Sequence, residues 1–76
     1  MEIKDFIENF ASSFDDTDMA SFTPQTKFRE LDEWTSMIAL STMAMISEEY
    51  DVELTADEMR RAQTIEDLFN ITKSHL

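Results

Sequence analysis

Large apolar residues near the start of the chain recur every three or four positions, which is the spacing of one face of an α-helix. Acidic and amide residues fill many of the positions between them, so the pattern predicts an amphipathic helix over residues 2–14. Its apolar face consists of Ile3, Phe6, Ile7, Phe10 and Phe14. We expect this face to pack against the core of the domain.

A long connection follows this helix. The aspartate-rich segment 15–18 ends the helical pattern, and Pro24 keeps the next residues irregular. The connection also contains four large apolar residues, Phe22, Phe28, Leu31 and Trp34. Because the burial of each such side chain contributes about 1.5–3 kcal/mol, we expect an ordered loop that packs over the helix ends.

Residues 36–50 have the pattern of a second, central helix, and Thr35 stands where its side chain would cap the first turn. The predicted core seam of this helix consists of Ala39, Met43, Ile46 and Tyr50. Further residues widen the apolar arc beyond that seam, namely Met37, Ile38, Leu40, Ala44 and Met45. A central helix that is buried on more than one side would place most of them in the core.

Two capping motifs predict helices in the last part of the chain. Thr55 is followed three positions later by Glu58, which predicts a short third helix that ends near Arg61. Thr64 begins a similar motif before a last helix, whose predicted core residues are Ile65, Leu68, Phe69 and Leu76. The sequence therefore predicts an all-α fold, a small four-helix bundle with a long first loop and a short third helix.

The length and the net charge of the chain indicate the broad class of protein. The 76 residues fit a single domain spanning residues 1–76, and a formal charge of −11 disfavours binding to nucleic acid or anionic lipid. No apolar run is long enough for a membrane span, and the first residues lack the pattern of a secretory signal. We expect a soluble, cytoplasmic monomer without membrane insertion, whose partners have basic surfaces.

Missing residue types exclude several kinds of chemistry. The chain has no glycine for a phosphate-binding loop and no cysteine for a disulfide or thiolate metal site. The only histidine, His75, is expected in a frayed C-terminal tail, so no Ser-His triad or zinc site can form within one chain. Asp15, Asp16 and Asp18 lack the glycine and glutamate of an EF-hand. We expect neither enzymatic activity nor a bound metal ion.

Three stretches share a common spacing that covers nearly the whole chain, namely Thr35-Ser36-Met37, Glu48-Glu49-Tyr50-Asp51 and Thr64-Ile65-Glu66-Asp67-Leu68. Together they resemble the acyl carrier protein family. Thr35-Ser36-Met37 is similar to the Asp-Ser-Leu motif that opens the second helix of the family. Glu48-Glu49-Tyr50-Asp51 is similar to the acidic-aromatic end of that helix, and Thr64-Ile65-Glu66-Asp67-Leu68 to the start of the last one. The resemblance implies that Ser36 accepts a 4′-phosphopantetheine arm from coenzyme A, through a phosphopantetheinyl transferase. The arm would carry acyl intermediates as thioesters in fatty-acid, polyketide or specialised biosynthesis.

The sequence departs from the family motif directly beside the serine. Thr35 stands where the family usually has aspartate, and Glu33-Trp34 replaces the glycine often found just before the motif. Threonine retains the helix cap but lacks the carboxylate that transferases of the family meet through magnesium and basic residues. We therefore expect a specialised carrier before a housekeeping fatty-acid carrier.

The predicted partner-binding residues are Trp34, Thr35, Met37, Leu40, Glu48, Glu49 and Asp51. Met37 and Leu40 lie one and four positions after Ser36 and are the members of the apolar arc most expected in solvent. The acidic members would meet basic surfaces of acyl-transferring, synthase or adenylating enzymes, although a plain solvated face explains them equally well. Trp34 is predicted first as a packing anchor and second as a contact that shapes partner recognition.

Two other functions remain open at the level of the sequence. An aminoacyl, peptidyl or D-alanyl carrier would use the same serine and the same arm. A degenerate helical protein-interaction module would have retained the fold without the arm, in which case Ser36 is an ordinary helix-start serine.

Overall fold

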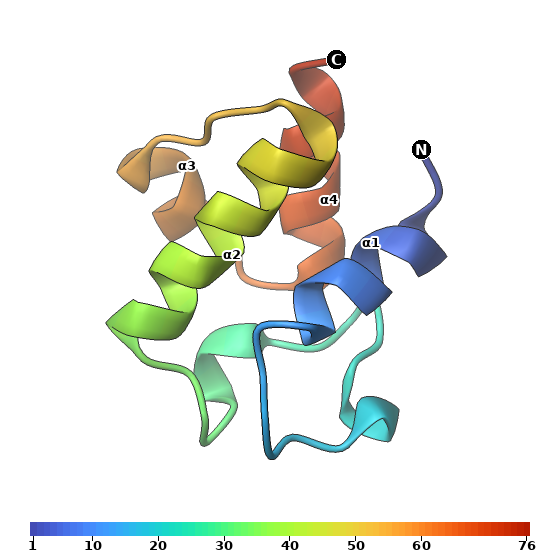
Figure 1. Cartoon of the computed structure of the whole chain (residues 1–76), viewed down its shortest axis with the longest axis vertical. Coiled ribbons are helices and arrows are strands. Elements are labelled where there is room, and N and C mark those ends of the chain that lie inside the picture. Colours follow the sequence, from blue (N-terminus) through green and yellow to red (C-terminus); the bar gives the residue numbers. More distant parts are fainter.

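Four α-helices and two short 3-10 helices make up the chain in the computed structural model, which describes all 76 residues (Figure 1). In chain order they are α1 (Ile3–Ala11), η1 (Met19–Ser21), η2 (Phe28–Glu30), α2 (Ser36–Tyr50), α3 (Ala56–Arg61) and α4 (Ile65–Ser74). There is no β-strand, and one isolated antiparallel bridge joins Lys27 to Thr64. The predicted all-α class, the long first loop and the short third helix are confirmed.

Helix α1 is shorter than the predicted residues 2–14. After Ala11 the Ser12 hydroxyl donates to the carbonyl oxygen of Asn9 at 2.6 Å, and the Phe14 amide donates to the carbonyl oxygen of Ala11 at 3.0 Å. Serine side chains that bond to the local backbone compete with helix continuation, so the helix gives way to a turn. Phe14 is nevertheless buried, because the turn directs it into the core.

An aromatic cluster forms the part of the core where α1 meets the first loop. The ring of Phe10 is fully buried, with the rings of Phe14, Phe22, Phe28 and Trp34 centred 5.4–6.4 Å away. Aromatic rings in tilted and edge-on arrangements at such distances attract each other, which adds to the free energy gained by burying their apolar surface. The predicted ordered loop is confirmed, since Phe22 and Phe28 are buried and Leu31 and Trp34 pack against the core.

Helix α2 faces the core with a different seam from the predicted one. Ile46 is fully buried as expected, but Ala39, Met43 and Tyr50 are half-buried, and Thr42 and Met45 occupy buried positions instead. The Thr42 hydroxyl donates to the carbonyl oxygen of Ile38 at 2.9 Å, so its burial leaves no unsatisfied polar atom. In the wider arc Met45 is buried and Ile38 half-buried, whereas Ala44 is exposed and the expectation that most of the arc is buried is wrong. Met37 and Leu40 are exposed, as expected for the two arc members beside Ser36.

The first loop is joined to the C-terminal helices by hydrogen bonds that involve backbone groups. Two amides at the start of α4 donate hydrogen bonds to the loop. The Ile65 amide donates to the carbonyl oxygen of Thr26 at 3.1 Å, and the Glu66 amide donates to the carbonyl oxygen of Pro24 at 3.0 Å. The Arg29 guanidinium donates to the carbonyl oxygens of Met59 and Ala62 at the end of α3. These bonds satisfy helix-end groups that have no partner inside their own helix.

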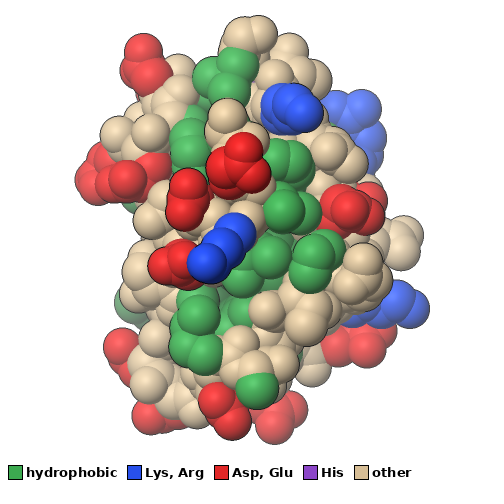
Figure 2. Space-filling model, turned by 90° about the vertical axis from the view of Figure 1, so that its right-hand side faces the viewer, with side chains coloured by type: hydrophobic (Ala, Val, Ile, Leu, Met, Phe, Trp, Pro, Cys, Tyr) green, Lys and Arg blue, Asp and Glu red, His purple; other side chains and the backbone are tan.

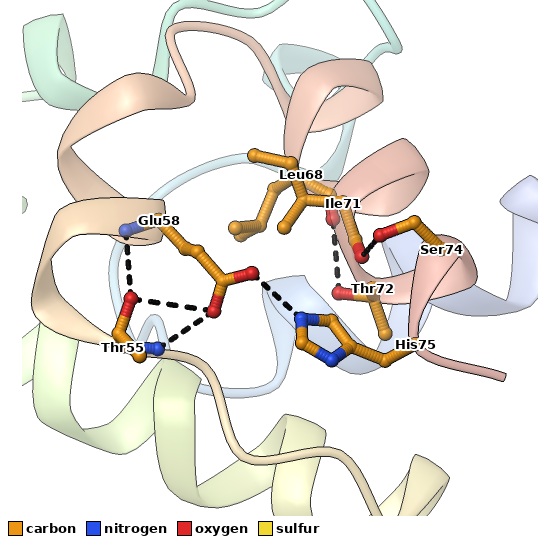
Figure 3. Close-up of polar contacts among 7 residues, drawn as sticks. All are labelled: Thr55, Glu58, Leu68, Ile71, Thr72, Ser74 and His75. Carbon is orange, nitrogen blue, oxygen red and sulfur yellow. Dashed lines mark hydrogen bonds and ion pairs between the residues drawn. The ribbon is translucent and has the colours of Figure 1, made fainter.

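The predicted capping motifs of α3 and α4 are both present as reciprocal capping boxes. In α3, the Glu58 amide donates to the Thr55 hydroxyl at 3.1 Å, and the Thr55 amide donates to the Glu58 carboxylate at 2.9 Å (Figure 3). The same carboxylate lies 2.6 Å from Nε2 of His75 (Figure 3). His75 thus connects the end of α4 to α3, where we expected a frayed tail, and the expected core residue Leu76 is exposed.

None of the helices combines the length and the apolar character that crossing a lipid bilayer would require.

Candidate functional site

Ser36 is the first residue of α2 and is exposed to solvent. The preceding residue, Thr35, has extended backbone angles, and its hydroxyl accepts a hydrogen bond from the Ile38 amide at 3.2 Å. The Ala39 amide donates to the carbonyl oxygen of Thr35 at 2.9 Å. The amides of Ser36 and Met37 have no acceptor within the chain, so two free N–H groups lie beside the exposed hydroxyl.

The charge around this helix end differs from that of the other α-helices. Helices α1, α3 and α4 each have one or two acidic residues in the first turn, whereas α2 has none. In a chain with 17 acidic residues, the first turn of α2 therefore contributes no carboxylate to the positive end of the helix dipole. Free N–H groups and the positive end of the dipole favour an anionic group attached at this position.

Glu33 orders the backbone on one side of this site. Its carboxylate accepts hydrogen bonds from the amides of Asp15, Asp16 and Thr17, at 2.7, 3.0 and 3.0 Å, and from the Thr17 hydroxyl at 2.7 Å. These bonds, foremost the one from the Asp15 amide, hold the pKa of the Glu33 carboxyl below its usual value, because they stabilise the ionised form. Sequence reasoning missed this role, because no spacing rule relates residue 33 to residues 15–17.

Trp34 holds the backbone on the other side of the Ser36 site. Its ring stacks on Phe10 and Phe14 with centroids 6.4 and 6.3 Å apart and contacts Phe28 at 4.9 Å. The side chain is half-buried, as expected of a packing anchor. Glu33 and Trp34 thus attach the segment before Ser36 to the first loop and to α1.

Met37 and Leu40 lie beside Ser36 with 76% and 67% of their surface exposed. The predicted partner-binding residues Thr35, Met37 and Leu40 are therefore brought together with the serine at one end of α2. Both apolar side chains remain available to another molecule, as does the exposed Ala44 one turn further along α2.

The acidic members of the predicted surface lie at the other end of α2. Glu48 and Glu49 are exposed, and at a rise of about 1.5 Å per residue Glu48 lies about 18 Å from Ser36 along the helix axis. Asp51 is the C-cap of α2, with a left-handed backbone at φ 55° and ψ 40°. The structure does not bring these three carboxylates to the serine; only a partner that spans the length of α2 would contact both ends.

The aspartates of the first loop do not form a metal site. The amides of Asp15 and Asp16 point to Glu33, and no group of three acidic or histidine side chains in the chain is arranged to hold an ion.

Comparisons with protein families, with curated proteins and with solved structures found no match to this chain. The fold and the site together define a small all-α domain that presents an exposed serine at the start of its longest helix.

Proposed function

We propose that this chain is an acyl carrier protein of the four-helix type and that Ser36 is its attachment site for 4′-phosphopantetheine. The observation that carries the proposal is an exposed hydroxyl beside two free N–H groups, at the one α-helix start that has no acidic residue in its first turn. The resemblance of the Thr35-Ser36-Met37, Glu48–Asp51 and Thr64–Leu68 stretches to that family gives the identity of the arm. The arm supplies a thiol that carries acyl groups as thioesters.

Ser36 acts as an acceptor in this function and needs no base of its own. In the active site of a phosphopantetheinyl transferase, its oxygen would form a bond to the inner phosphorus of coenzyme A while the bond to the bridging pyrophosphate oxygen breaks. Adenosine 3′,5′-bisphosphate leaves, and the hydroxyl proton passes to a base of the transferase. The amides of Ser36 and Met37, which have no acceptor within the chain, would donate to the resulting phosphodiester.

The residues around the serine would cap the helix and contact the partner enzymes. Thr35 caps α2 without a carboxylate, so the cognate transferase must recognise a less acidic site than in most of the family. Met37 and Leu40 offer flexible apolar contacts to successive partner enzymes. Glu48, Glu49 and Asp51 would steer acyl-transferring, synthase or adenylating enzymes through their basic docking surfaces.

The deciding experiment is the intact mass of the chain after incubation with coenzyme A and a broad-specificity phosphopantetheinyl transferase. We expect a gain equal to one phosphopantetheine arm, and no gain for Ser36→Ala. The matched control is Ser41→Ala, because Ser41 is also exposed on α2 but lies inside the helix. A gain that persists in Ser36→Ala, or no gain with several transferases, overturns the assignment of Ser36.

The same measurement separates the alternatives. The absence of an arm in every case would favour the helical interaction module, which Thr35 in place of the usual aspartate also allows. A loaded chain that accepts amino acids in a coupled adenylation assay would be an aminoacyl or D-alanyl carrier. A loaded chain that elongates saturated fatty chains at a high rate would be a housekeeping carrier instead of the specialised one we propose.

A further inference from the structure

A second apolar surface lies away from Ser36, between α1 and η1. It is an open groove of about 450 Å³, and its apolar lining consists of Ile3, Ile7, Met19, Phe22 and Pro24. In Figure 1, α1 and η1 lie at the right of the molecule, whereas α2 starts at the left. Figure 2 views the right-hand side and shows a band of hydrophobic side chains bordered by acidic side chains, with Lys or Arg side chains within and beside the band.

The groove exists because the apolar arc of α1 is wider than the face that the core covers. Phe6 and Phe10 are fully buried, but Ile3 and Ile7, one turn apart on the flank of α1, are only half-buried. Across from them, Met19 keeps 55% of its surface in solvent. No other element of the chain covers these three side chains, and apolar side chains gathered in this way are typical of interaction sites.

Charge determines what kind of molecule fits the groove. The chain has a formal charge of −11, so a second copy, a nucleic acid or an anionic lipid surface would be repelled. Glu8 is the acidic residue and Lys4 the basic residue that line the groove, and the exposed Asp18 directly precedes Met19 at the start of η1. The net negative charge of the molecule therefore favours a partner with cationic groups flanking an apolar ridge.

We propose that the α1–η1 groove binds a cationic amphipathic helix of a partner protein. The apolar face of that helix would pack on Ile3, Ile7 and Met19, and lysine or arginine side chains beside it would meet the acidic edges. The unbranched Met19 side chain lets the wall of the groove adjust to the partner. Since the groove lies away from Ser36, a partner bound there leaves the serine accessible, and the proposal does not depend on the loading of Ser36.

The test uses the isotope-labelled full chain and a synthetic amphipathic peptide of leucine and lysine, followed by NMR. We expect the largest chemical-shift changes at Ile3, Ile7, Met19 and Phe22, and no binding of the matching peptide in which glutamate replaces every lysine. Ser36→Ala should bind the peptide as the unchanged chain does. Failure of loading at Ser36 and failure of groove binding are therefore distinguishable.

Two exposed methionines provide a matched pair of variants. Met19→Asn should weaken binding of the lysine peptide at least about fivefold, because it removes a large apolar contact. Met37→Asn, the same change on α2, should leave the affinity within about twofold. Shift changes centred on Met37 and Leu40, or equal affinities of the two variants, would overturn the proposal. Groove shifts that depend on protein concentration without peptide would assign the groove to a second copy and would overturn it as well.

Discussion

At the scale of single residues, one carboxylate organises much of the irregular first loop. Glu33 accepts four hydrogen bonds from residues 15–17, three of them from backbone amides that have no helix to bond to. Backbone N–H groups need partners, and an ionised carboxylate is a strong acceptor. The conformation of the loop before Ser36 therefore depends on the Glu33 side chain as well as on the buried aromatic residues.

The variant Glu33→Gln should lower the melting temperature at pH 7, because a neutral amide accepts fewer and weaker bonds. The folded-state pKa of Glu33 is depressed below the ordinary 4.5, so its stabilisation is present above pH 4.5 and is lost as the pH falls through the folded-state pKa. The melting difference between the two chains should accordingly shrink in acid. The neighbouring exposed Asp32→Asn is the control, and an effect of equal size there would refute the role of Glu33.

Thr35 permits a test of the proposed loading site by a single substitution. Aspartate is as good an N-cap as threonine and adds a negative charge at the positive end of α2, so Thr35→Asp should leave the melting temperature unchanged or slightly higher. It also restores the residue of the acyl carrier motif, so loading by a transferase of that family should become faster.

Thr35→Ala is the contrasting variant. Loss of the bond to the Ile38 amide should cost about 1 kcal/mol, which lowers the melting temperature of a domain this size by about 4–8 °C. Initial loading rates and thermal melts of the three chains decide the matter. Slower loading of Thr35→Asp would contradict the assignment of the motif.

At the scale of elements, the C-cap of α2 is an aspartate, whose negative charge is unfavourable at the C-terminal end of a helix. Asp51 is the only residue of the chain with positive φ, and it places a negative charge at the negative end of the helix dipole. It also stands close in sequence to Glu48, Glu49 and Glu53. The charge of Asp51 is therefore unfavourable for the stability of α2.

Asp51→Asn should therefore stabilise the domain by about 0.3–1 kcal/mol, because asparagine also adopts the left-handed conformation and has no charge. The urea midpoint and the thermal midpoint should both rise. Glu53→Gln removes a nearby charge without changing the cap and serves as the comparison. An unchanged or lower midpoint for Asp51→Asn would show that its carboxylate contributes a stabilising contact.

The aromatic cluster joins α1 to the first loop, and Phe10 lies within it. Phe10→Ala should cost about 3–5 kcal/mol, a large part of the stability of a domain this small. Phe10→Leu should cost less, because most of the volume is retained. Chemical denaturation measures both, and Leu40→Ala on exposed α2 surface should change stability by at most about 0.5 kcal/mol. Equal effects of the Phe10 and Leu40 changes would contradict the described core.

At the scale of the whole molecule, like charges outweigh ion pairs. The formal charge is −11 with the histidine counted as neutral, and the ion pair within hydrogen-bond reach is Arg60 with Asp57. The molecule measures 30 × 24 × 20 Å, comparable to the screening length of about 30 Å at 0.01 M salt. At low salt, every carboxylate therefore repels most of the others.

Raising sodium chloride from 0.01 to 0.5 M, or adding magnesium, should raise the melting temperature by several degrees, because screening weakens this repulsion more than it weakens a single exposed ion pair. Thermal melts followed by circular dichroism provide the measurement. Asp51→Asn should show a smaller dependence on salt than the unchanged chain. Identical melting at both ionic strengths would refute the dominance of repulsion.

The sequence by itself determined the features that depend on neighbours within about one helical turn. Apolar spacing located α2 at Ser36–Tyr50, and the Thr55 and Thr64 motifs located α3 and α4. The exposed side chains of Met37 and Leu40 were also predicted beside Ser36. These features follow from local sequence because caps and helical faces are set by residues three or four positions apart.

Only the tertiary structure decided which residues far apart in the sequence meet. It brings Glu33 to residues 15–17, Arg29 to the carbonyl ends of α3, and His75 to Glu58. It also turns Thr42 and Met45 of α2 into the core and leaves the flank of α1 uncovered. No periodic pattern encodes such contacts, because each depends on how already formed helices and loops pack together, and packing is fixed by the shapes of all the side chains at once.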